Sequence, residues 1–293
     1  MTVPSYVRSI PVMGTIATIQ VVDSRSCEEL VERAFEWFIQ IEARCSRFDP
    51  QSELMQLTAQ AGIEVSVSAI LYEAVQFALA VAEETGGAFD PAVGRQMEAA
   101  GFNREYQTGR LVHTTVDTDV SVSYRDVRLN PEKKTITLMR PMILDLGAVA
   151  KGLAVDMAAR ELQPLENFAI DAGGDLYLAG NNAEGAPWSV GIRHPRIDGE
   201  LIDSIPISNR AVCTSGDYER GNHILDPRQE RTGTAVASVT VVAPTAMLAD
   251  AVATAAFVLG PAEGIQLFER LGVEGLIVSS ELERFETQGM FHG

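Results

Sequence analysis

The sequence has 293 residues, of which 46% are hydrophobic and 22% charged, a composition typical of a folded globular chain that can bury its own core. Its 23 Lys and Arg against 40 Asp and Glu give a formal net charge of −17, which repels phosphate backbones and anionic lipid surfaces. Only three residues are lysines and the arginines are scattered, so we expect neither a nucleic acid nor a membrane surface as a partner.

The cysteines and the N-terminal residues indicate a reducing compartment. Cys27, Cys45 and Cys213 are odd in number and widely spaced, which excludes a disulfide framework and a CxxC site. The opening segment MTVPSYVRSIPVMGTI has no basic stretch followed by an apolar core, and it has no lipid-acceptor cysteine. We therefore expect a cytoplasmic protein without membrane insertion.

In the first half of the chain, periodicity predicts strands and long helices. The first strand is expected at 15–22, and helices at 27–47 and 68–84, the second with Ser68 as its N-cap and Gly86-Gly87 as its stop. Residues 104–130 are polar and rich in turn formers. Strands are expected at 134–139 and 142–146, followed by a helix from Gly147 to about Leu162.

The second half is dominated by strands. They are expected at 168–170, 176–179, 188–192, 205–207, 211–214, 236–242 and 275–278, with helices at 246–259 and 261–271. Strands that come in runs favour an α+β fold with a mainly antiparallel sheet. No composition shift marks a boundary, so we treat 1–293 as a single domain.

The common dinucleotide, P-loop, zinc-protease and hydrolase motifs are absent from the sequence, but LDLGAVAKG at 144–152 can bind an anion. A strand would deliver Asp145 into a tight Gly147 turn that opens a helix, whose N–H groups and Lys151 attract negative charge. The simpler alternative is a surface corner with a solvated lysine.

A second candidate is the helix in TAMLADAVATA, residues 245–255. Asp250 and Thr254 are four residues apart and share a helix face, which suits a hard cation that takes oxygen ligands. An exposed Asp and a hydroxyl bonded within the helix fit the spacing equally well.

Two glycine-rich segments, DAGGDLYLAG at 171–180 and TSGDYERGNHILDP at 214–227, allow a ligand to approach the backbone closely, although they also suit plain turns. His223 lies in the second segment and can act as a proton acceptor near neutral pH. A structural histidine is the alternative.

In this order the segments resemble the FAD:protein FMN transferase family, the ApbE-like flavin transferases. The resemblance rests on eight motifs along nearly the whole chain: MGT (13–15), SRFDPQSEL (46–54), GGAFDPAVG (86–94), LDLGAVAKG, DAGGDLYLAG, TSGDYER (214–220), HILDP (223–227) and SVTVVAPTAMLADAVATA (238–255). It implies an ApbE-like, T-fold-like α+β architecture. It also implies Mg²⁺-dependent transfer of FMN from FAD to a threonine or serine of an acceptor flavoprotein, with release of AMP.

Matching positions one at a time, the resemblance implies two sets of site residues. Those expected to contact FAD are Met13, Phe48, Ala88, Phe89, Asp90, Asp145, Lys151 and Leu225, and those expected to hold magnesium are Ala148 through its carbonyl, Asp250 and Thr254. His223 or Asp217 would accept the proton of the attacking hydroxyl.

Two departures from the family pattern affect these expectations. Ala253 stands where some members have a second acid, and the run DPRQERTG is one residue shorter than usual before SVTV. The missing second acid makes a non-catalytic FAD-binding protein one alternative to the transferase. An FAD pyrophosphatase that gives FMN and AMP is another, because the same residues can serve water as the nucleophile.

Overall fold

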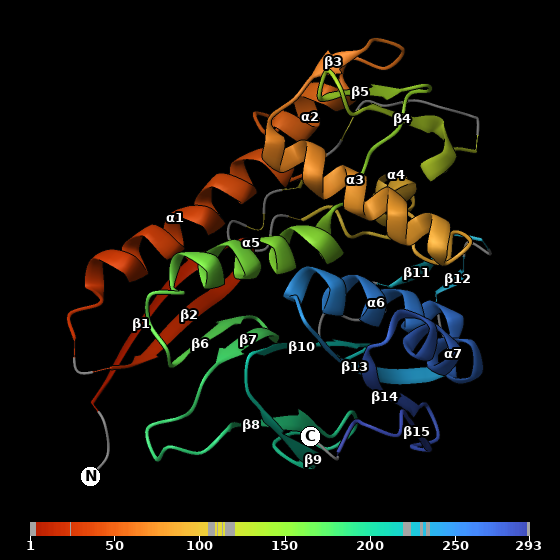
Figure 1. Ribbon diagram of the computed structural model, residues 1–293. Coiled ribbons are helices and arrows are strands. Elements are labelled where there is room, and N and C mark those ends of the chain that lie inside the picture. The colour runs from red at the N-terminus through yellow and green to blue at the C-terminus, as the bar shows by residue number, and fades with distance from the viewer. Residues whose placement is uncertain are drawn as a thin grey trace.

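A computed structural model describes residues 4–23, 25–104, 109, 111–112, 114, 121–218, 224–228, 231–232 and 235–291. Long helices lie along one face of a broad sheet, and a smaller group of short strands lies beyond them (Figure 1). The helices are α1 (Glu28–Cys45), α2 (Glu53–Thr58), α3 (Ala69–Glu84), α4 (Gly94–Ala99), α5 (Gly147–Glu161), α6 (Ala246–Leu259) and α7 (Pro261–Leu271), with 3-10 turns at Pro91–Val93 and Tyr124–Asp126.

The main sheet has eight strands, and each neighbouring pair is antiparallel. Their spatial order is β1 (Ser5–Val12), β2 (Thr15–Val22), β6 (Phe168–Ala172), β7 (Asp175–Ala179), β10 (Arg210–Gly216), β13 (Val236–Ala243), β14 (Glu274–Ser279) and β15 (Arg284–Glu286). Three smaller sheets pair β3 (Val65–Ser66) and β4 (Val127–Asn130) with β5 (Thr135–Leu138), β8 (Trp188–Arg193) with β9 (Leu201–Ile207), and β11 (Leu225–Asp226) with β12 (Arg231–Thr232). The predicted α+β class with a mainly antiparallel sheet is confirmed.

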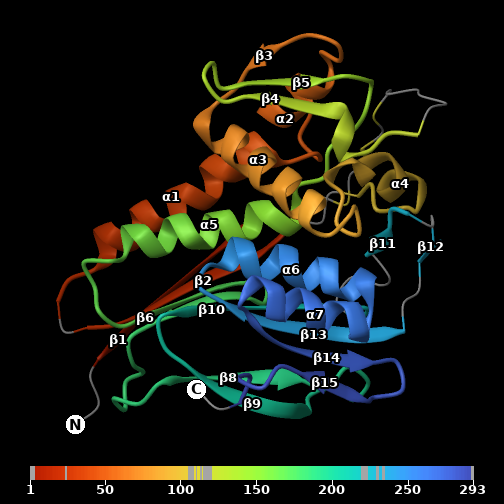
Figure 2. The same ribbon diagram turned by 45° about the vertical axis from the view of Figure 1, so that its right-hand side comes forward.

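The main sheet is covered on both faces. Helices α5, α6 and α7 lie along one face, and the β8–β9 hairpin lies on the other (Figure 2). A second hydrophobic cluster, which includes Trp188 and Ile205 of the hairpin with Val212 and Leu276 of the sheet, fills the space under the hairpin. Every residue of β13 is buried as a result, which explains its unbroken apolar run.

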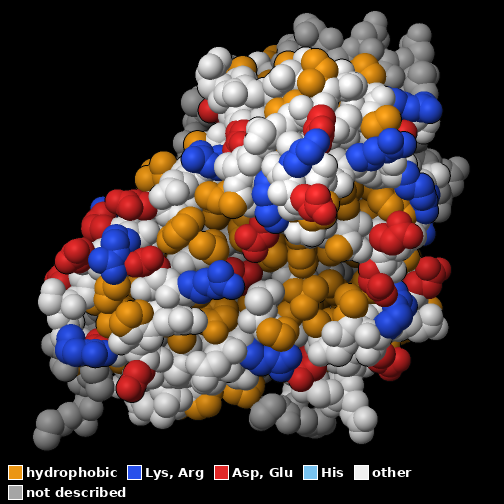
Figure 3. Space-filling view, turned by 45° about the horizontal axis from the view of Figure 1, so that its top comes forward, with side chains coloured by type: hydrophobic (Ala, Val, Ile, Leu, Met, Phe, Trp, Pro, Cys, Tyr) orange, Lys and Arg blue, Asp and Glu red, His pale blue; other side chains and the backbone are white. Residues whose placement is uncertain are grey.

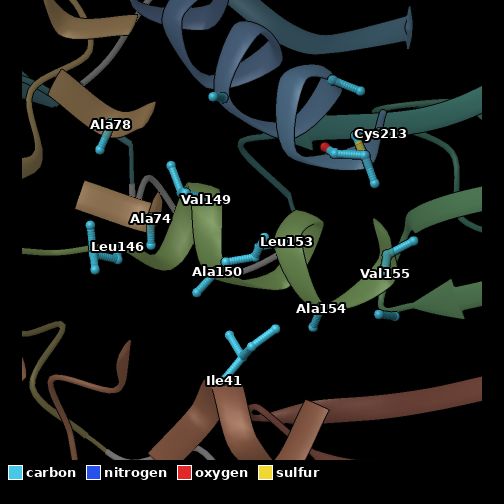
Figure 4. Close-up of a cluster of buried hydrophobic side chains, with 14 of the residues drawn as sticks. Ile41, Ala74, Ala78, Leu146, Val149, Ala150, Leu153, Ala154, Val155 and Cys213 are labelled. Atoms are coloured by element: carbon cyan, nitrogen blue, oxygen red, sulfur yellow. The ribbon is translucent and has the colours of Figure 1, made fainter. Parts of the chain in front are cut away.

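Helix α5 lies at the centre of the core. In Figure 4, Leu153 and Ala154 of α5 lie among side chains of its neighbours, with Ile41 of α1 on one side and Ala74 of α3 on another. Its many alanines, valines and glycines let these neighbours approach closely, and a helix covered on most sides shows little amphipathic pattern.

The closest of these approaches is the one between α5 and α6 at Gly152. A Cβ atom added there would lie 2.4 Å from the Cα of Met247 and 2.5 Å from its backbone N. We expect Gly152→Ala to lower the free energy of unfolding by about 1–3 kcal/mol through overpacking, although alanine favours helix. Urea unfolding measures the loss. Equal stability of G152A and the wild type would contradict this packing.

Most predicted elements are found, with one error and several omissions. Residues 142–146 are mostly buried but form no strand, because their backbone bonds to a turn instead: Asp145 N donates to Pro91 O (2.7 Å) and Gly94 N to Ile143 O (3.1 Å). The apolar run therefore indicated burial and not a partner strand. The sequence predicts none of the strands β1, β3, β4, β11, β12 and β15 and neither of the short helices α2 and α4. Ser68 does cap α3 by accepting from Leu71 N.

Asp156 of α5 caps the start of α6. Its carboxylate accepts from Ala246 N (2.7 Å) and Met247 N (3.0 Å), and burial raises its pKa from 3.8 to about 6. The folded chain therefore binds this proton more tightly than the unfolded chain, and the stability that this protonation contributes is lost as the pH rises from about 4 to about 6.

In the described part of the chain, no helix combines the length and the apolar character needed to span a membrane.

The Asp156→Asn variant tests this titration. We expect the difference in unfolding free energy between the wild type and D156N to change by roughly 2–3 kcal/mol between pH 4 and pH 7, with the wild type losing more. Urea unfolding of both proteins at pH 4, 5, 6 and 7 measures it, and comparison of the two slopes removes the other titrating groups. Parallel pH profiles would contradict the assignment.

Candidate functional site

One cavity of about 500 Å³ lies where α5, α6 and the ends of the central strands meet the loops before α2, α4 and α5. This volume is typical of a site for a nucleotide-sized ligand. The face in Figure 3 shows hydrophobic side chains among scattered charges of both signs. All the positions that the resemblance implied for FAD and for the metal line the cavity: Met13, Phe48, Ala88, Phe89, Asp90, Asp145, Ala148, Lys151, Leu225, Asp250 and Thr254.

Three charged side chains meet at the inner end of this cavity. The Lys151 ammonium of α5 donates to Asp250 of α6 (3.1 Å) and to Asp175 at the start of β7. Both carboxylates are almost inaccessible, with 3% of Asp175 and 5% of Asp250 exposed. One cation therefore faces two buried anions, an imbalance that favours the entry of a further positive charge.

The described residues that line the cavity have the same imbalance. Among them, five carboxylates outnumber the three cationic side chains of Arg47, Arg104 and Lys151; the acids are Glu42, Asp90, Asp145, Asp175 and Asp250. An anionic ligand such as a pyrophosphate is repelled by such a surplus unless a cation accompanies it.

Neutral oxygen atoms complete the donor set near Asp250. Thr254 lies one turn along α6, lines the same cavity and has its hydroxyl 3.4 Å from that of Ser215. Ala148 departs from helical geometry (φ −91°, ψ 17°) at the first turn of α5, which tilts its carbonyl away from the usual helix direction. Carboxylate, hydroxyl and carbonyl oxygens suit a hard divalent cation.

The turn before α5 is organised by Asp145. One carboxylate oxygen accepts from the Gly147 N–H (2.7 Å) and the other from Arg47 Nε (2.6 Å). The first backbone donor of the predicted anion turn is therefore already used, and Lys151 is paired as well. Positive potential at this turn is consequently lower than the motif suggested.

Hydrogen bonds within two turns hold Asp90 and Met13 in the wall of the cavity. Asp90 accepts from Ala92 N (2.8 Å) and Tyr124 N (3.1 Å), and burial raises its pKa. Met13 adopts φ +52° between β1 and β2, and its N–H donates to Glu42 (2.9 Å). These bonds hold the Ala88–Asp90 run and Met13 in the wall of the cavity.

The two candidates for the proton acceptor have different standing. Asp217 is held by Arg196 through two hydrogen bonds (2.7 and 2.8 Å) and is not among the residues that line the cavity. His223 lies outside the described residues. The geometry therefore places Asp217 away from the described residues that line the cavity.

Sequence reasoning overlooked Arg47 and Asp175, although both lie inside quoted motifs. A signal was present in each case: an arginine directly before the predicted FAD contact Phe48, and an acid directly after the glycine pair at 173–174. Only the structure shows that they are buried charges that touch predicted site residues.

Comparison with known proteins agrees with this geometry. The family model described as "ApbE family" matches residues 13–277, which is most of the chain. The chain belongs to the ApbE family. Among curated members, it is 30% identical to the FAD:protein FMN transferase of Haemophilus influenzae over 88% of this chain and 82% of the relative, and 33% identical to that of Treponema pallidum over 94% and 85%.

The ApbE fold is shared as well. A crystal structure of the ApbE protein of Thermotoga maritima superposes with a TM-score of 0.87 and 30% sequence identity, covering 99% of this chain and 100% of that one. The predicted ApbE-like architecture is thereby confirmed.

Proposed function

We propose that this ApbE-family chain is an FAD:protein FMN transferase that uses magnesium, moves FMN from FAD to a threonine or serine of an acceptor flavoprotein and releases AMP. The main support is that one cavity of nucleotide size is lined by all the residues implied for FAD and for the metal, which come from segments as distant as Met13 and Thr254. Curated relatives that bear this enzyme name cover most of the chain and support the same activity.

The donor set fits magnesium. Asp250, Thr254 and the Ala148 carbonyl offer only oxygen atoms, and Asp250 shares the Lys151 ammonium with a second buried carboxylate, Asp175. No group of three or more His, Cys, Asp or Glu side chains suited to a metal occurs among the described residues, so hydroxyl, carbonyl and ligand oxygens would supply the remaining contacts. When bound, the ion would offset negative charge on the pyrophosphate and on the leaving AMP.

In the reaction, the acceptor hydroxyl oxygen attacks the phosphorus nearer the flavin. A new oxygen–phosphorus bond forms, the bond from that phosphorus to the bridging oxygen breaks, and AMP leaves with the bridging oxygen. Little covalent chemistry falls to the protein, so catalysis comes from positioning. Asp145 and the Phe48 ring orient FAD, and Lys151 keeps the two buried carboxylates in place. The hydroxyl proton passes to His223, because Asp217 is held by Arg196 outside the cavity lining.

A transfer assay tests the proposal. The protein is incubated with FAD, Mg²⁺ and a flavoprotein domain that carries a D-x-x-[ST]-x-[AS]-[ST] segment, and the acceptor is weighed by mass spectrometry. We expect the acceptor to gain one FMN and AMP to appear in equal amount, and neither to occur when Mg²⁺ is replaced by EDTA. An acceptor whose target Thr or Ser is changed to Ala is the control.

Two other outcomes would replace the proposal. Free FMN and AMP without a mass gain would identify an FAD pyrophosphatase, in which water takes the place of the acceptor hydroxyl. FAD that survives long incubation intact would identify a binding protein, in line with Ala253 at the position of the second acid.

A further inference from the structure

Arg47, which no motif assigned to the site, lies in the wall of the cavity just after α1. Only 5% of the residue is exposed, and its guanidinium joins three segments of the wall. Nε donates to Asp145 (2.6 Å), Nη2 donates to the Phe102 carbonyl (2.6 Å), and the guanidinium carbon lies 4.1 Å from the centre of the Phe48 ring. Each of these three residues also lines the cavity.

The guanidinium of Arg47 determines the orientation of the Asp145 carboxylate. With one oxygen bonded to Arg47 and the other to the Gly147 N–H, the carboxylate cannot rotate freely. A carboxylate has about four acceptor positions, so lone pairs remain for donors of a ligand. An amino or hydroxyl group of a nucleotide would therefore meet an acceptor that is already oriented, and binding would not have to order it.

The same side chain also constrains the Phe48 ring. A guanidinium stacked on an aromatic face at this distance makes a favourable cation–π contact, and a planar group holds the ring in one plane. Lysine has no such plane and cannot bond Asp145 and the Phe102 carbonyl through two fixed N–H groups.

One donor atom of Arg47 is not used in holding the cavity wall together. Its Nη1 is buried and has no hydrogen-bond partner within the part of the chain that the structure describes. Folded proteins rarely leave such a donor unpaired, and the exceptions tend to have a functional reason.

We propose that Arg47 is a positioning residue of the FAD site, which acts by holding the Asp145 carboxylate and the Phe48 ring in the orientation that receives the ligand. The inference rests on the proposed function, since FAD is taken as the ligand. It differs from a purely structural role because Arg47 should affect affinity through Asp145.

The test is a double-mutant cycle on FAD affinity, measured by the change in flavin fluorescence with Mg²⁺ present. Arg47→Lys keeps the positive charge but loses the planar group with two fixed N–H donors, and Asp145→Asn keeps the shape of the side chain but loses its negative charge. We expect each variant to raise the Kd at least tenfold, and the double variant R47K/D145N to raise it about tenfold as well, because both changes disable the same unit.

Arg210→Lys is the matched control. Arg210 also bonds one carboxylate, Glu274 (2.9 Å), and one backbone carbonyl, that of Val242 (3.4 Å), but it lies outside the cavity lining. We expect R210K to leave the Kd for FAD unchanged. Far-UV circular dichroism establishes that each variant is folded, and Arg47→Met, which keeps the packing on Phe48, replaces R47K in the cycle if the lysine variant does not fold.

The possible results separate this inference from the proposed function. Wild-type affinity in R47K, or a double variant weakened about a hundredfold, would overturn the positioning role, because Arg47 would then be dispensable or independent of Asp145. If the wild-type protein itself binds no FAD, the proposed function fails, and so does the inference built on it.

Discussion

Replacing Asp250 with Asn should reduce magnesium-dependent turnover of FAD by at least a hundredfold. Asp250 is 5% exposed, faces Lys151 and supplies the only carboxylate among the three positions proposed to hold the ion. An amide keeps the size of the side chain but removes its negative charge, so the cation should bind more weakly and the loss should fall in the range seen when one electrostatic contact to a developing charge is deleted. Initial rates measured over a series of Mg²⁺ concentrations give both the maximum rate and the half-saturating concentration.

The appropriate control for D250N is Asp156→Asn. Asp156 is likewise a carboxylate on a core helix, but it caps α6 and does not line the cavity. At pH 7 we expect D156N to retain the wild-type dependence on Mg²⁺. If D250N showed an unchanged half-saturating concentration, the metal assignment would be wrong.

Replacing Lys151 with Met should have the largest effect on stability. The ammonium is the cation between Asp175 and Asp250, and its removal leaves two carboxylates that are 3% and 5% exposed without it. Breaking a buried ion pair from one side costs about 3–5 kcal/mol, because the remaining carboxylates stay desolvated and lose the attraction of the ammonium. Urea unfolding at pH 7 without divalent ions should show this loss relative to the wild type.

Magnesium should restore part of the stability lost in K151M. A divalent ion that binds the folded chain at Asp250 replaces the missing positive charge, so millimolar Mg²⁺ should raise the unfolding free energy of K151M more than that of the wild type. Lys133→Met is the control, since Lys133 makes an exposed pair with Glu64 (3.4 Å), and it should change stability by less than about 0.5 kcal/mol. Equal responses of wild type and K151M to Mg²⁺ would mean that the ion does not bind beside these carboxylates.

The packing of α5 on α6 connects these predictions. Ala148 and Lys151 belong to α5, Asp250 and Thr254 belong to α6, and Gly152 lets the two helices approach without a side chain between them. The Gly152→Ala change should therefore weaken Mg²⁺ binding as well as the fold. This explains why a glycine follows Lys151 directly in the LDLGAVAKG motif.

Several parts of the site could be predicted because their signal is local. Ser68 is a typical N-cap residue and predicts the start of α3. The four-residue spacing of Asp250 and Thr254 places both on one helix face, and the order of the motifs identifies the family. Each of these depends on residues close together in the sequence or on motif order alone. The structure confirms that the positions drawn from them share one cavity.

Other parts depend on which segments meet in space. The apolar run at 142–146 predicts a strand, yet the backbone partners of this segment are Pro91 and Gly94. Nothing in the sequence around Asp175 indicates that Lys151 of α5 contacts it. Arg47 belongs to the site only because Asp145 and Phe102 lie beside it in the fold. No periodicity or spacing encodes such contacts.

The sequence by itself determined the fold class, the family and part of the cavity lining, because these follow from local periodicity and from ordered motifs. The tertiary structure decided the electrostatics. The sequence suggested Lys151 as a source of positive potential for an anion, whereas the fold places it between two buried carboxylates and leaves a surplus of negative charge. The physical reason is that charge balance depends on distance and burial, which packing between remote segments sets. The net charge of −17 thus has a local counterpart at the site, where we expect a cation to accompany the pyrophosphate.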